Sequence, residues 1–221
     1  MTAYRVNEVF DTLQGEGTYT GRACTFIRLQ GCPVGCAWCD TKYTWSAGAP
    51  ATWEQVLAKM MGHHDESCAE VDEHFLAEQM EQRGAGHVVI SGGEPALYDL
   101  LPLTRALFDR DITSQVETSG THPLSVHENT WVTCSPKLDK PGGFMVLRSV
   151  LERADEIKMP VGKVRDIEDL KRRVLPFTAD HPVVYLQPLS MSQKATALCI
   201  QAARENRWSV SLQVHKLAGL R

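Results

Sequence analysis

Three cysteines stand close together early in the chain, with three residues in the first gap and two in the second. They are Cys32, Cys36 and Cys39, in the stretch RLQGCPVGCAWCDTKYTW. A structural zinc site closes a tetrahedron with four Cys or His ligands, often as two C-x2-C pairs, and only one such pair is present. His63 and His64 could complete a zinc site only from a polar segment whose spacing matches no zinc motif.

Two other chemistries are open to these cysteines. A redox pair formed by Cys36 and Cys39 would leave Cys32 without a function. A four-iron, four-sulfur cluster normally takes four thiolates, so three thiolates would leave one iron without a protein ligand. Catalytic metal sites keep such an open position for a substrate or cofactor. An iron–sulfur catalyst is therefore the interpretation that uses all three cysteines.

The composition limits the class of protein further. The chain has 221 residues, 43% hydrophobic and 23% charged, and a net charge of -4, which is typical of one globular domain and gives no electrostatic preference for nucleic acid. The N-terminus lacks a basic start before an apolar run, and no stretch nears the roughly 18 apolar residues of a membrane helix. Seven cysteines, an odd number, argue against a disulfide framework. We therefore expect one cytoplasmic domain over residues 1–221, with no membrane span and no direct nucleic-acid partner.

Short runs rich in β-branched or apolar residues predict strands, and segments with helical spacing lie between several of them. The predicted strands are 25–31, 87–93, 114–120, 131–137, 155–160, 183–189 and 209–215, and the predicted helices are 52–61, 72–82, 97–109 and 193–205. Such alternation predicts an α/β fold with parallel strands, as a doubly wound sheet or a complete or partial barrel, whose ligands bind at the carboxyl ends of the strands. Residues 62–70, GHHDESCAE, predict a polar surface connection.

The spacing C-x3-C-x2-C, with Trp38 directly before the last cysteine, is similar to the signature of the radical S-adenosylmethionine (SAM) superfamily. This resemblance implies a single domain with a partial (βα) barrel of parallel strands and a cluster loop at residues 32–39. It also implies a [4Fe-4S] cluster bound by Cys32, Cys36 and Cys39. SAM would fill the open position on the fourth iron, and an electron from the cluster would cleave it to a carbon radical.

Further motifs narrow the resemblance over nearly the whole chain. TLQGEGTYTGRACTFIRLQGCPVGCAWCDT, SGGEP, ETSGTH, WVTCSPK, EIKMPVGKVRDIEDL, LQPLS and QVHK occur in an order that resembles the 7-carboxy-7-deazaguanine synthases. These lyases convert 6-carboxy-5,6,7,8-tetrahydropterin to 7-carboxy-7-deazaguanine with loss of ammonia, a step of purine metabolism toward queuosine in tRNA. The resemblance implies dependence on Mg2+, a homodimer, and an electron donor such as flavodoxin or ferredoxin.

The same resemblance assigns roles to individual residues. The cofactor would be bound by Trp38, Cys39, Asp40, Gly92, Gly93, Glu94, Glu117, Ser135, Pro136, Lys137, Gln187, Pro188, Leu189 and Ser190. The substrate would be bound by Leu13, Gln14, Gly15, Glu16, Arg28, Ser91, His215 and the terminal Arg221, and Mg2+ by Thr41. The substrate's carboxylate calls for a cation, and Arg28, four residues before Cys32 on the same strand-to-loop passage, would place a guanidinium near the cluster. Ser91 stands where the family has Thr, and the ending HKLAGLR differs from the family's usual end.

Two rival functions share the cysteine loop. An activating enzyme for a glycyl-radical partner would need a protein substrate, whereas Arg28 and the LQGEG stretch favour a small anionic one. A non-catalytic iron–sulfur regulatory module would not need the SAM-binding motifs. The remaining cysteines fit no cluster signature and are interpreted as buried thiols: Cys24, Cys68, Cys134 and Cys199.

Overall fold

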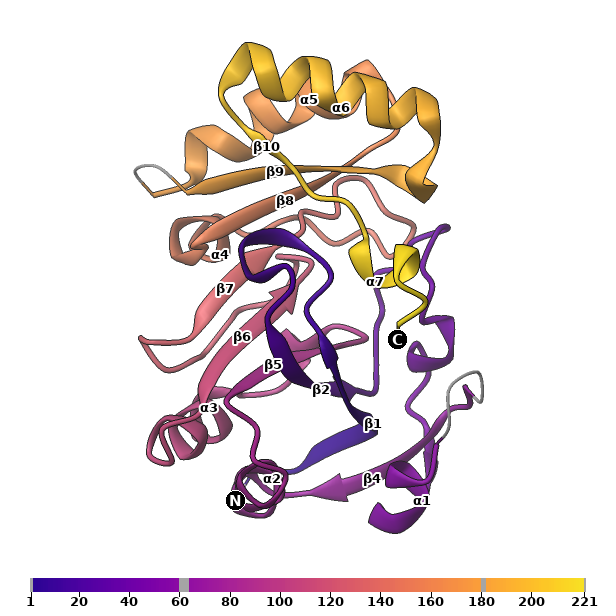
Figure 1. Cartoon of the computed structure of the whole chain (residues 1–221), viewed down its shortest axis with the longest axis vertical. Coiled ribbons are helices and arrows are strands. Elements are labelled where there is room, and N and C mark those ends of the chain that lie inside the picture. The colour runs from indigo at the N-terminus through magenta and orange to yellow at the C-terminus, as the bar shows by residue number, and fades with distance from the viewer. Residues whose placement is uncertain (1, 60–63, 180–181, 221) are drawn as a thin grey trace.

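A computed structural model describes residues 2–59, 64–179 and 182–220 of the chain. Within these residues one ten-stranded sheet forms, in the order β10-β9-β8-β7-β6-β5-β2-β1-β4-β3 (Figure 1). The strands are β1 Tyr4–Leu13, β2 Ala23–Leu29, β3 Ala49–Pro50, β4 Ser67–Val71, β5 His87–Gly92, β6 Thr113–Thr118, β7 Trp131–Cys134, β8 Glu156–Val161, β9 Val183–Pro188 and β10 Ser209–Val210.

Most neighbouring strands run parallel. Every pair from β2–β5 through β9–β10 is parallel, as is β3–β4, whereas β1 pairs antiparallel with both β2 and β4. The direction of the strands turns steadily from β10 to β4, and the two end strands β10 and β3 do not pair in the part of the chain described (Figure 1). The chain is therefore a single α/β domain with a mostly parallel, open sheet, an order compatible with a partial barrel.

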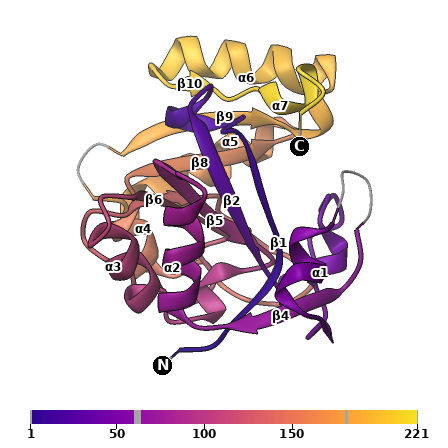
Figure 2. The same ribbon diagram turned by 60° about the horizontal axis from the view of Figure 1, so that its bottom comes forward.

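Helices connect the parallel strands and cover the sheet from outside. They are α1 Trp53–Leu57, α2 Glu73–Gln82, α3 Leu101–Phe108, α4 Arg148–Arg153, α5 Val164–Asp169, α6 Gln193–Asn206 and α7 Val214–Leu217, with short 3-10 turns that include η1 Gly17–Tyr19 and η3 Pro95–Leu97. Figure 2 shows α6 lying beside β9 and β10 on the outer side of the sheet. None of the helices in the described residues is long and apolar enough to cross a membrane.

The core has two parts that follow the two halves of the sheet. One part surrounds β1, β2 and β5 and is closed by α2 and α3, and the other surrounds β7, β8 and β9 and is closed by α4, α5 and α6. The run from His87 to Ile90 is fully buried, as parallel strands covered on both faces require. The hydrophobic effect thus fixes the strands, and their carboxyl ends meet on one side.

Several predicted elements differ from the structure at their ends. The helix predicted over 97–109 is split, because the 3-10 turn η3 ends at Leu97 and α3 begins only at Leu101, next to a proline in its first turn. The strand predicted over 209–215 is strand only at β10, and residues 214–217 form α7 instead. Of the helix predicted over 52–61, α1 covers Trp53–Leu57, while residues 60 and 61 lie outside the described ranges.

The prediction of a polar connection over residues 62–70 is wrong for its second half. Residues 67–71 form β4, in which Cys68 and Ala69 are buried and three residues pair with the start of β1. Short strands of mixed polarity pair in this way when a neighbouring strand offers free backbone groups. Residues 62 and 63 lie outside the described ranges. Strand β1, which the sequence analysis did not predict, contains buried polar residues that mask its apolar alternation.

Candidate active site

One pocket opens at the carboxyl ends of the parallel strands. It is lined by segments from β1, β2, β5, β6, β8 and β9, by the cysteine loop and by the segment leading into α7. The predicted site residues that line it are Leu13, Gln14, Gly15, Glu16, Arg28, Cys32, Cys36, Trp38, Cys39, Asp40, Thr41, Ser91, Gly92, Gly93, Glu94, Glu117, Ser135, Lys137, Gln187, Pro188, Leu189, Ser190 and His215. Pro136 is not among the lining residues, and Arg221 lies outside the described residues.

Backbone hydrogen bonds shape the cysteine loop from within. The N–H of Cys39 donates to the carbonyl of Cys36 at 3.0 Å, which closes a tight turn between two of the three cysteines. The N–H of Cys32 donates to the carbonyl of Trp45 at 3.3 Å. These backbone bonds give the loop a defined shape, and all three cysteines line the pocket.

A second loop supports the cysteine loop from outside. The N–H of Gly142 donates to the carbonyl of Val34 at 3.1 Å, and Gly35 beside it has a φ of +72°, a conformation that glycine adopts without strain. The ammonium of Lys140 lies 4.1 Å from the centre of the Trp38 ring, a cation–π contact. The aromatic residue that precedes the last cysteine is thus half covered by the 140–142 segment.

Burial sets the protonation state of two of the three thiols in the cysteine loop. Burial raises the pKa of Cys32 to about 11 and raises that of Cys36, although Lys137 and Lys140 partly oppose the effect at Cys36. Burial alone therefore favours the protonated thiol, and a bound metal is what would make thiolates stable there. None of the seven cysteines, all in described segments, forms a disulfide.

Within the described residues, no three Cys, His, Asp or Glu side chains converge as the ligands of one ion would. The ligands of a compact single-ion site such as structural zinc all bind one atom at about 2 Å, and these side chains of the described residues do not stand in that arrangement. Their spacing does not conflict with a four-iron cluster, because each thiolate binds a different iron and the sulfur atoms then stand farther apart. The three pocket-lining cysteines are compatible with the cluster that the sequence predicts.

The two glycines at the end of β5, Gly92 and Gly93, bring the backbone of the pocket wall against the cysteine loop. A Cβ atom on Gly93 would lie 2.0 Å from the carbonyl oxygen of Gly31 and 3.0 Å from Cβ of Cys32. Gly92 has a φ of +130°, and a Cβ there would lie 2.2 Å from the carbonyl oxygen of Leu29. Only glycine fits at these contacts, so this stretch sets the distance between β5 and the start of the loop.

Glu94 is held inside the protein by its own neighbours. It is 1% exposed, and its carboxylate accepts hydrogen bonds from the Thr118 hydroxyl at 2.6 Å, the Ser119 N–H at 2.8 Å and the Ala96 N–H at 3.0 Å. It therefore joins the end of β5 to the end of β6. In addition to the cofactor contact predicted for it, Glu94 fixes two pocket-lining segments relative to each other.

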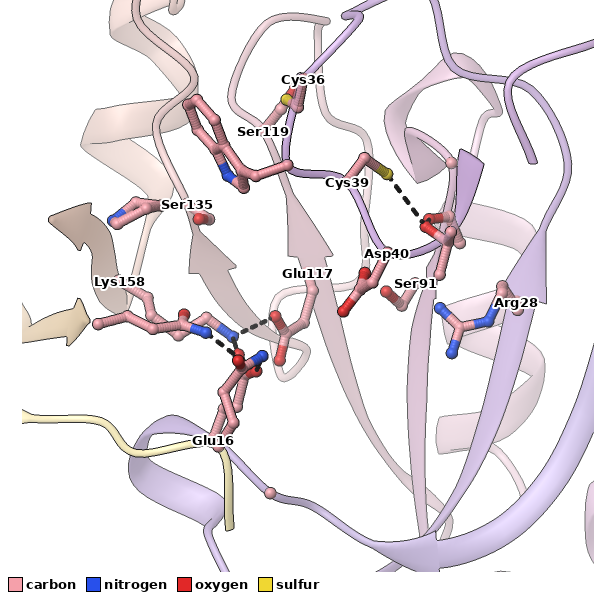
Figure 3. A pocket seen from close by; sticks show the side chains of 18 of the residues that line it. Glu16, Arg28, Cys36, Cys39, Asp40, Ser91, Glu117, Ser119, Ser135 and Lys158 are labelled. Carbon is pink, nitrogen blue, oxygen red and sulfur yellow. Dashed lines mark hydrogen bonds and ion pairs between the residues drawn. The ribbon is translucent and has the colours of Figure 1, made fainter. Parts of the chain in front are cut away.

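Arg28 lies in a charged and aromatic setting at the pocket wall. Its Nε donates to Glu8 and its guanidinium lies over the Phe10 ring, 5.6 Å from the ring centre. The Tyr43 hydroxyl, just beyond the cysteine loop, donates to the same oxygen of Glu8 at 2.7 Å. Arg28 is also the register partner of Ser91 in β5, so the two residues predicted to bind substrate are neighbours on the sheet (Figure 3).

Thr41 and Asp40 follow the last cysteine at the pocket's edge. The Thr41 hydroxyl lies 3.4 Å from the Cys39 sulfur and 3.5 Å from the carbonyl oxygen of Gly92. Asp40 faces the pocket, and its carboxylate lies 3.4 Å from the ammonium of Lys216. A hydroxyl with one weak contact on each side remains able to serve as a single protein ligand of a hydrated magnesium ion.

A buried lysine at the bottom of the pocket is a residue that the sequence analysis missed. The Lys158 side chain is 3% exposed, and its ammonium donates to Glu16 at 2.6 Å and to Glu117 (Figure 3). The other oxygen of Glu16 accepts from the amides of Gln213 at 2.8 Å and Gln187 at 3.1 Å. Residues from β6, β8, β9 and two loops thus meet at one cation.

These contacts shift the pKa of both charged partners. Burial alone would raise the pKa of Glu16, but Lys158 and the Gln213 amide bring it down to about 2. Burial alone would lower the pKa of Lys158, but Glu117 and Glu16 raise it above the usual lysine range. Both groups are therefore charged at neutral pH, as a buried pair with satisfied hydrogen bonds must be.

Comparison with known proteins decides the family. The chain is 49% identical to the 7-carboxy-7-deazaguanine synthase of Escherichia coli (strain K12), with 96% of this chain and 97% of that protein covered. It is 40% identical to the synthase of Buchnera aphidicola subsp. Schizaphis graminum, with 99% of each chain covered. A crystal structure of QueE from Escherichia coli superposes with a TM-score of 0.91 at 48% identity, with 96% of this chain and 94% of that chain covered. No family model matches the chain.

The chain belongs to the 7-carboxy-7-deazaguanine synthase family. The family resemblance and the α/β class predicted from the sequence are thereby confirmed. The named relatives give no support to an activating enzyme or to a non-catalytic iron–sulfur module.

In this synthase-family chain, the segment before and within α7 closes one side of the pocket. The Val214 N–H donates to the carbonyl of Gly15 at 3.0 Å, and the Ser211 hydroxyl accepts from the Gly17 N–H at 2.9 Å. His215 packs so closely on Gly15 that a Cβ there would lie 2.0 Å from its Nδ1. Burial lowers the pKa of His215 although Glu16 opposes it, so the imidazole is neutral at pH 7.

Two further residues expected to face the cofactor sit at strand ends. The Lys137 ammonium donates to the Ser135 carbonyl at 2.8 Å and to its hydroxyl at 2.6 Å, and burial lowers the pKa of Lys137. Ser190, after β9, has a φ of +53°, an uncommon conformation for a residue with a side chain. Such strained positions are often kept where a backbone must meet a ligand.

The missed residues share a feature that explains why they were missed. Lys158 lies in EIKMP, Gln213 in LQVHK and Glu8 in NEVF, and each is a polar residue within or beside a run of apolar residues. The only available signal was this interruption, because a charged residue inside a strand pattern must find a partner in the fold. The identity of that partner could not be deduced from the sequence.

Proposed function

We propose that this chain converts 6-carboxy-5,6,7,8-tetrahydropterin to 7-carboxy-7-deazaguanine with loss of ammonia. One observation carries the proposal: in a synthase-family chain the predicted cluster ligands, and all of the predicted cofactor and substrate residues except Pro136 and Arg221, line a single pocket. A radical reaction needs these groups within one closed space, because a carbon radical attacks most C–H bonds that it meets.

We assign the cluster to Cys32, Cys36 and Cys39, and SAM to the pocket side formed by the ends of β5, β6, β7 and β9. When bound, the cluster and SAM supply a 5'-deoxyadenosyl radical, and Mg2+ held by Thr41 supplies a Lewis acid. The protein excludes water and holds the ligands in register. Gly92 and Gly93 keep the β5 backbone close to the cysteine loop, and Glu94 locks that backbone to the end of β6.

The substrate side is assigned to Arg28, Gln14, Glu16 and His215. Glu8 and Phe10 hold the Arg28 side chain from its Nε side and its face, which suits a guanidinium meant to receive a carboxylate with its remaining N–H groups. Glu16, charged at neutral pH, is an acceptor for the amine and N–H donors of a pterin edge. His215, neutral at the same pH, offers a directional hydrogen bond without adding charge.

We also infer from the family resemblance that the enzyme acts as a homodimer and takes its electron from a flavodoxin or ferredoxin. A sedimentation experiment on the purified chain tests the first statement. Reduction of the cluster by a purified flavodoxin, followed by absorbance, tests the second.

The decisive experiment is an anaerobic assay of the reconstituted protein with carboxytetrahydropterin, SAM and dithionite, with and without Mg2+. A product lighter than the substrate by one ammonia, formed faster with Mg2+, is the expected result. SAM cleavage without any such product would overturn the proposed substrate. In the same assay, Arg28→Lys should raise the KM for the pterin roughly tenfold or more, because an ammonium cannot bind a carboxylate with two parallel hydrogen bonds.

A further inference from the structure

Lys158 occupies a position between the two halves of the pocket. It reaches up from β8 beneath the pocket floor, with 3% of its side chain exposed. One of its partners, Glu16, lies 142 residues away in the loop assigned to the substrate. The other, Glu117, lies 41 residues away at the end of β6, on the side assigned to SAM.

The outer contacts of the two carboxylates extend the network to both sides. Besides binding Lys158, Glu16 accepts hydrogen bonds from the amides of Gln187 and Gln213. Gln187 comes from β9, and Gln213 comes from the segment before α7. Besides binding Lys158, Glu117 accepts a hydrogen bond from the Gln14 amide, whose nitrogen lies 3.1 Å from Glu117 Oε1. Displacement of one carboxylate therefore changes the balance of forces on the ammonium and, through it, on the other carboxylate.

The Lys158 ammonium separates two carboxylates that would otherwise repel each other. Without it, Glu16 and Glu117 would be two partly buried carboxylates facing each other, a like-charge pair whose charged forms are strongly disfavoured. Glu156, two residues before Lys158 on the same strand, is a third buried carboxyl, and burial raises its pKa. Lys158 is thus the cation that binds two acidic side chains from separate parts of the fold, with a third buried carboxyl nearby on its own strand.

We propose that Lys158 is a positioning residue that couples the substrate half of the pocket to the cofactor half, by holding Glu16 and Glu117 in one fixed arrangement. The inference rests on the proposed function for the names of the two ligands. Binding of either ligand orders one carboxylate, and the shared ammonium then orders the other. The affinity for SAM and the affinity for the pterin should consequently rise together.

The test measures binding by the reconstituted holoenzyme and not its turnover. SAM is titrated against the electron paramagnetic resonance signal of the reduced cluster, with and without 6-carboxypterin, an aromatic analogue that lacks the hydrogens of the reduced ring. In the native enzyme the analogue should tighten SAM binding by about fivefold or more. In Lys158→Met this factor should fall to about one, and each separate affinity should weaken roughly tenfold.

Two further variants separate positioning from a purely structural contribution. Lys158→Arg keeps the positive charge and should recover most of the coupling, whereas Lys194→Met removes an exposed lysine on α6 and should change neither affinity. If Lys158→Met does not fold, Glu16→Gln decides the matter. Its change lies on the substrate side, yet it should weaken SAM binding, because Glu16 shares Lys158 with Glu117 and also accepts from Gln187.

The proposal is overturned if Lys158→Met retains the native coupling factor, or if Glu16→Gln binds SAM as tightly as the native enzyme does. Failure of the proposed function looks different. In that case the native enzyme yields no deazapurine from the pterin, while the effects of Lys158→Met and Glu16→Gln on SAM binding still decide whether Lys158 joins the two halves.

Discussion

The cysteine loop and the Lys158 network lie in the same pocket but are built by opposite means. The loop, residues 32–39, is a continuous stretch with one turn closed by its own backbone and with backbone hydrogen bonds to Trp45 and Gly142. The network joins side chains separated by 41 and 142 residues. A site built locally can be recognised from spacing, whereas a site built from distant residues depends on the whole sheet for its geometry.

The two regions also differ in which groups bind their polar and ionisable side chains. The buried thiols of the loop carry raised pKa values, so the loop reaches its functional charge state only with a metal bound. In the network, one ammonium binds two carboxylates, and glutamine amides donate to the other oxygen of Glu16. The loop therefore depends on an added group, and the network is complete within the protein.

Substitution of Cys36 by Ala should have the largest effect, because it removes a ligand that the cysteine loop needs to bind its cluster. The cluster should fail to assemble, so the iron content, the brown absorption and product formation of the reconstituted protein should fall to background. Cys199→Ala is the matched control: that thiol is fully buried against the core of the sheet's second half, so its loss should cost on the order of 1 kcal/mol of stability and leave the iron content unchanged. A brown, active Cys36→Ala enzyme would contradict the assignment of the cluster.

Substitution of Gly93 by Ala tests whether the loop depends on the backbone next to it. The new Cβ would meet the Gly31 carbonyl at 2.0 Å, so the backbone before Cys32 must shift. We expect turnover to fall at least about tenfold, since displacement of reacting groups by about 1 Å has effects of this size or larger. Gly86→Ala, where no atom lies within 4 Å of the added Cβ, should leave turnover unchanged. Equal turnover in the two variants would show that the close approach is not needed.

His87 tests the far end of the network by pH. Its Nε2 lies 3.4 Å from the Gln115 oxygen, which also accepts from Gln14, and burial followed by repulsion from Arg22 lowers its pKa to about 4. Between pH 6.5 and about 4, His87 is therefore protonated in the unfolded chain but neutral in the folded protein. The free energy of unfolding consequently falls as the pH drops through this range. The loss is on the order of 3 kcal/mol.

The check is the thermal unfolding midpoint of the native protein and of His87→Gln at several pH values from 7 to 4. The native midpoint should fall more steeply with acid than that of the variant, which has no titrating group there. Glu16 contributes a separate loss, because its lowered pKa stabilises the fold above pH 4.5 and this contribution fades as pH falls toward about 2. Parallel curves above pH 4.5 would show that His87 is not the group responsible.

Lys216→Ala should have the smallest effect, although it removes a direct link between the cysteine loop and α7. The ammonium lies 3.4 Å from Asp40, and both side chains are about half exposed or more, at 45% and 66%. Exposed pairs of this kind contribute roughly 0.2–1 kcal/mol and are screened by salt. The KM for the pterin should rise less than about threefold, and added salt should reduce the difference from the native enzyme. A larger, salt-independent rise would show that Lys216 contacts the substrate itself.

The sequence by itself determined the local chemistry. The spacing of Cys32, Cys36 and Cys39 excluded a two-pair zinc site, and the alternation of apolar runs with helical segments predicted a parallel α/β sheet. Gly92 and Gly93 could be placed at the end of a strand, because they follow a run rich in β-branched residues and glycine allows backbone conformations that other residues avoid. Such features depend on a few neighbouring residues, and the fold leaves them unchanged.

Only the tertiary structure decided which distant groups meet. Glu8 pairs with Arg28, Glu94 bonds to the end of β6, and Lys158 joins Glu16 to Glu117. The strands β1 and β4 were also found only in the tertiary structure. Their buried residues include polar ones, so no clear apolar alternation marks these strands in the sequence, and pairing with neighbouring strands buries them. A buried charge must be paired, but many partners of opposite sign were available in the chain, and the strand order selected one of them.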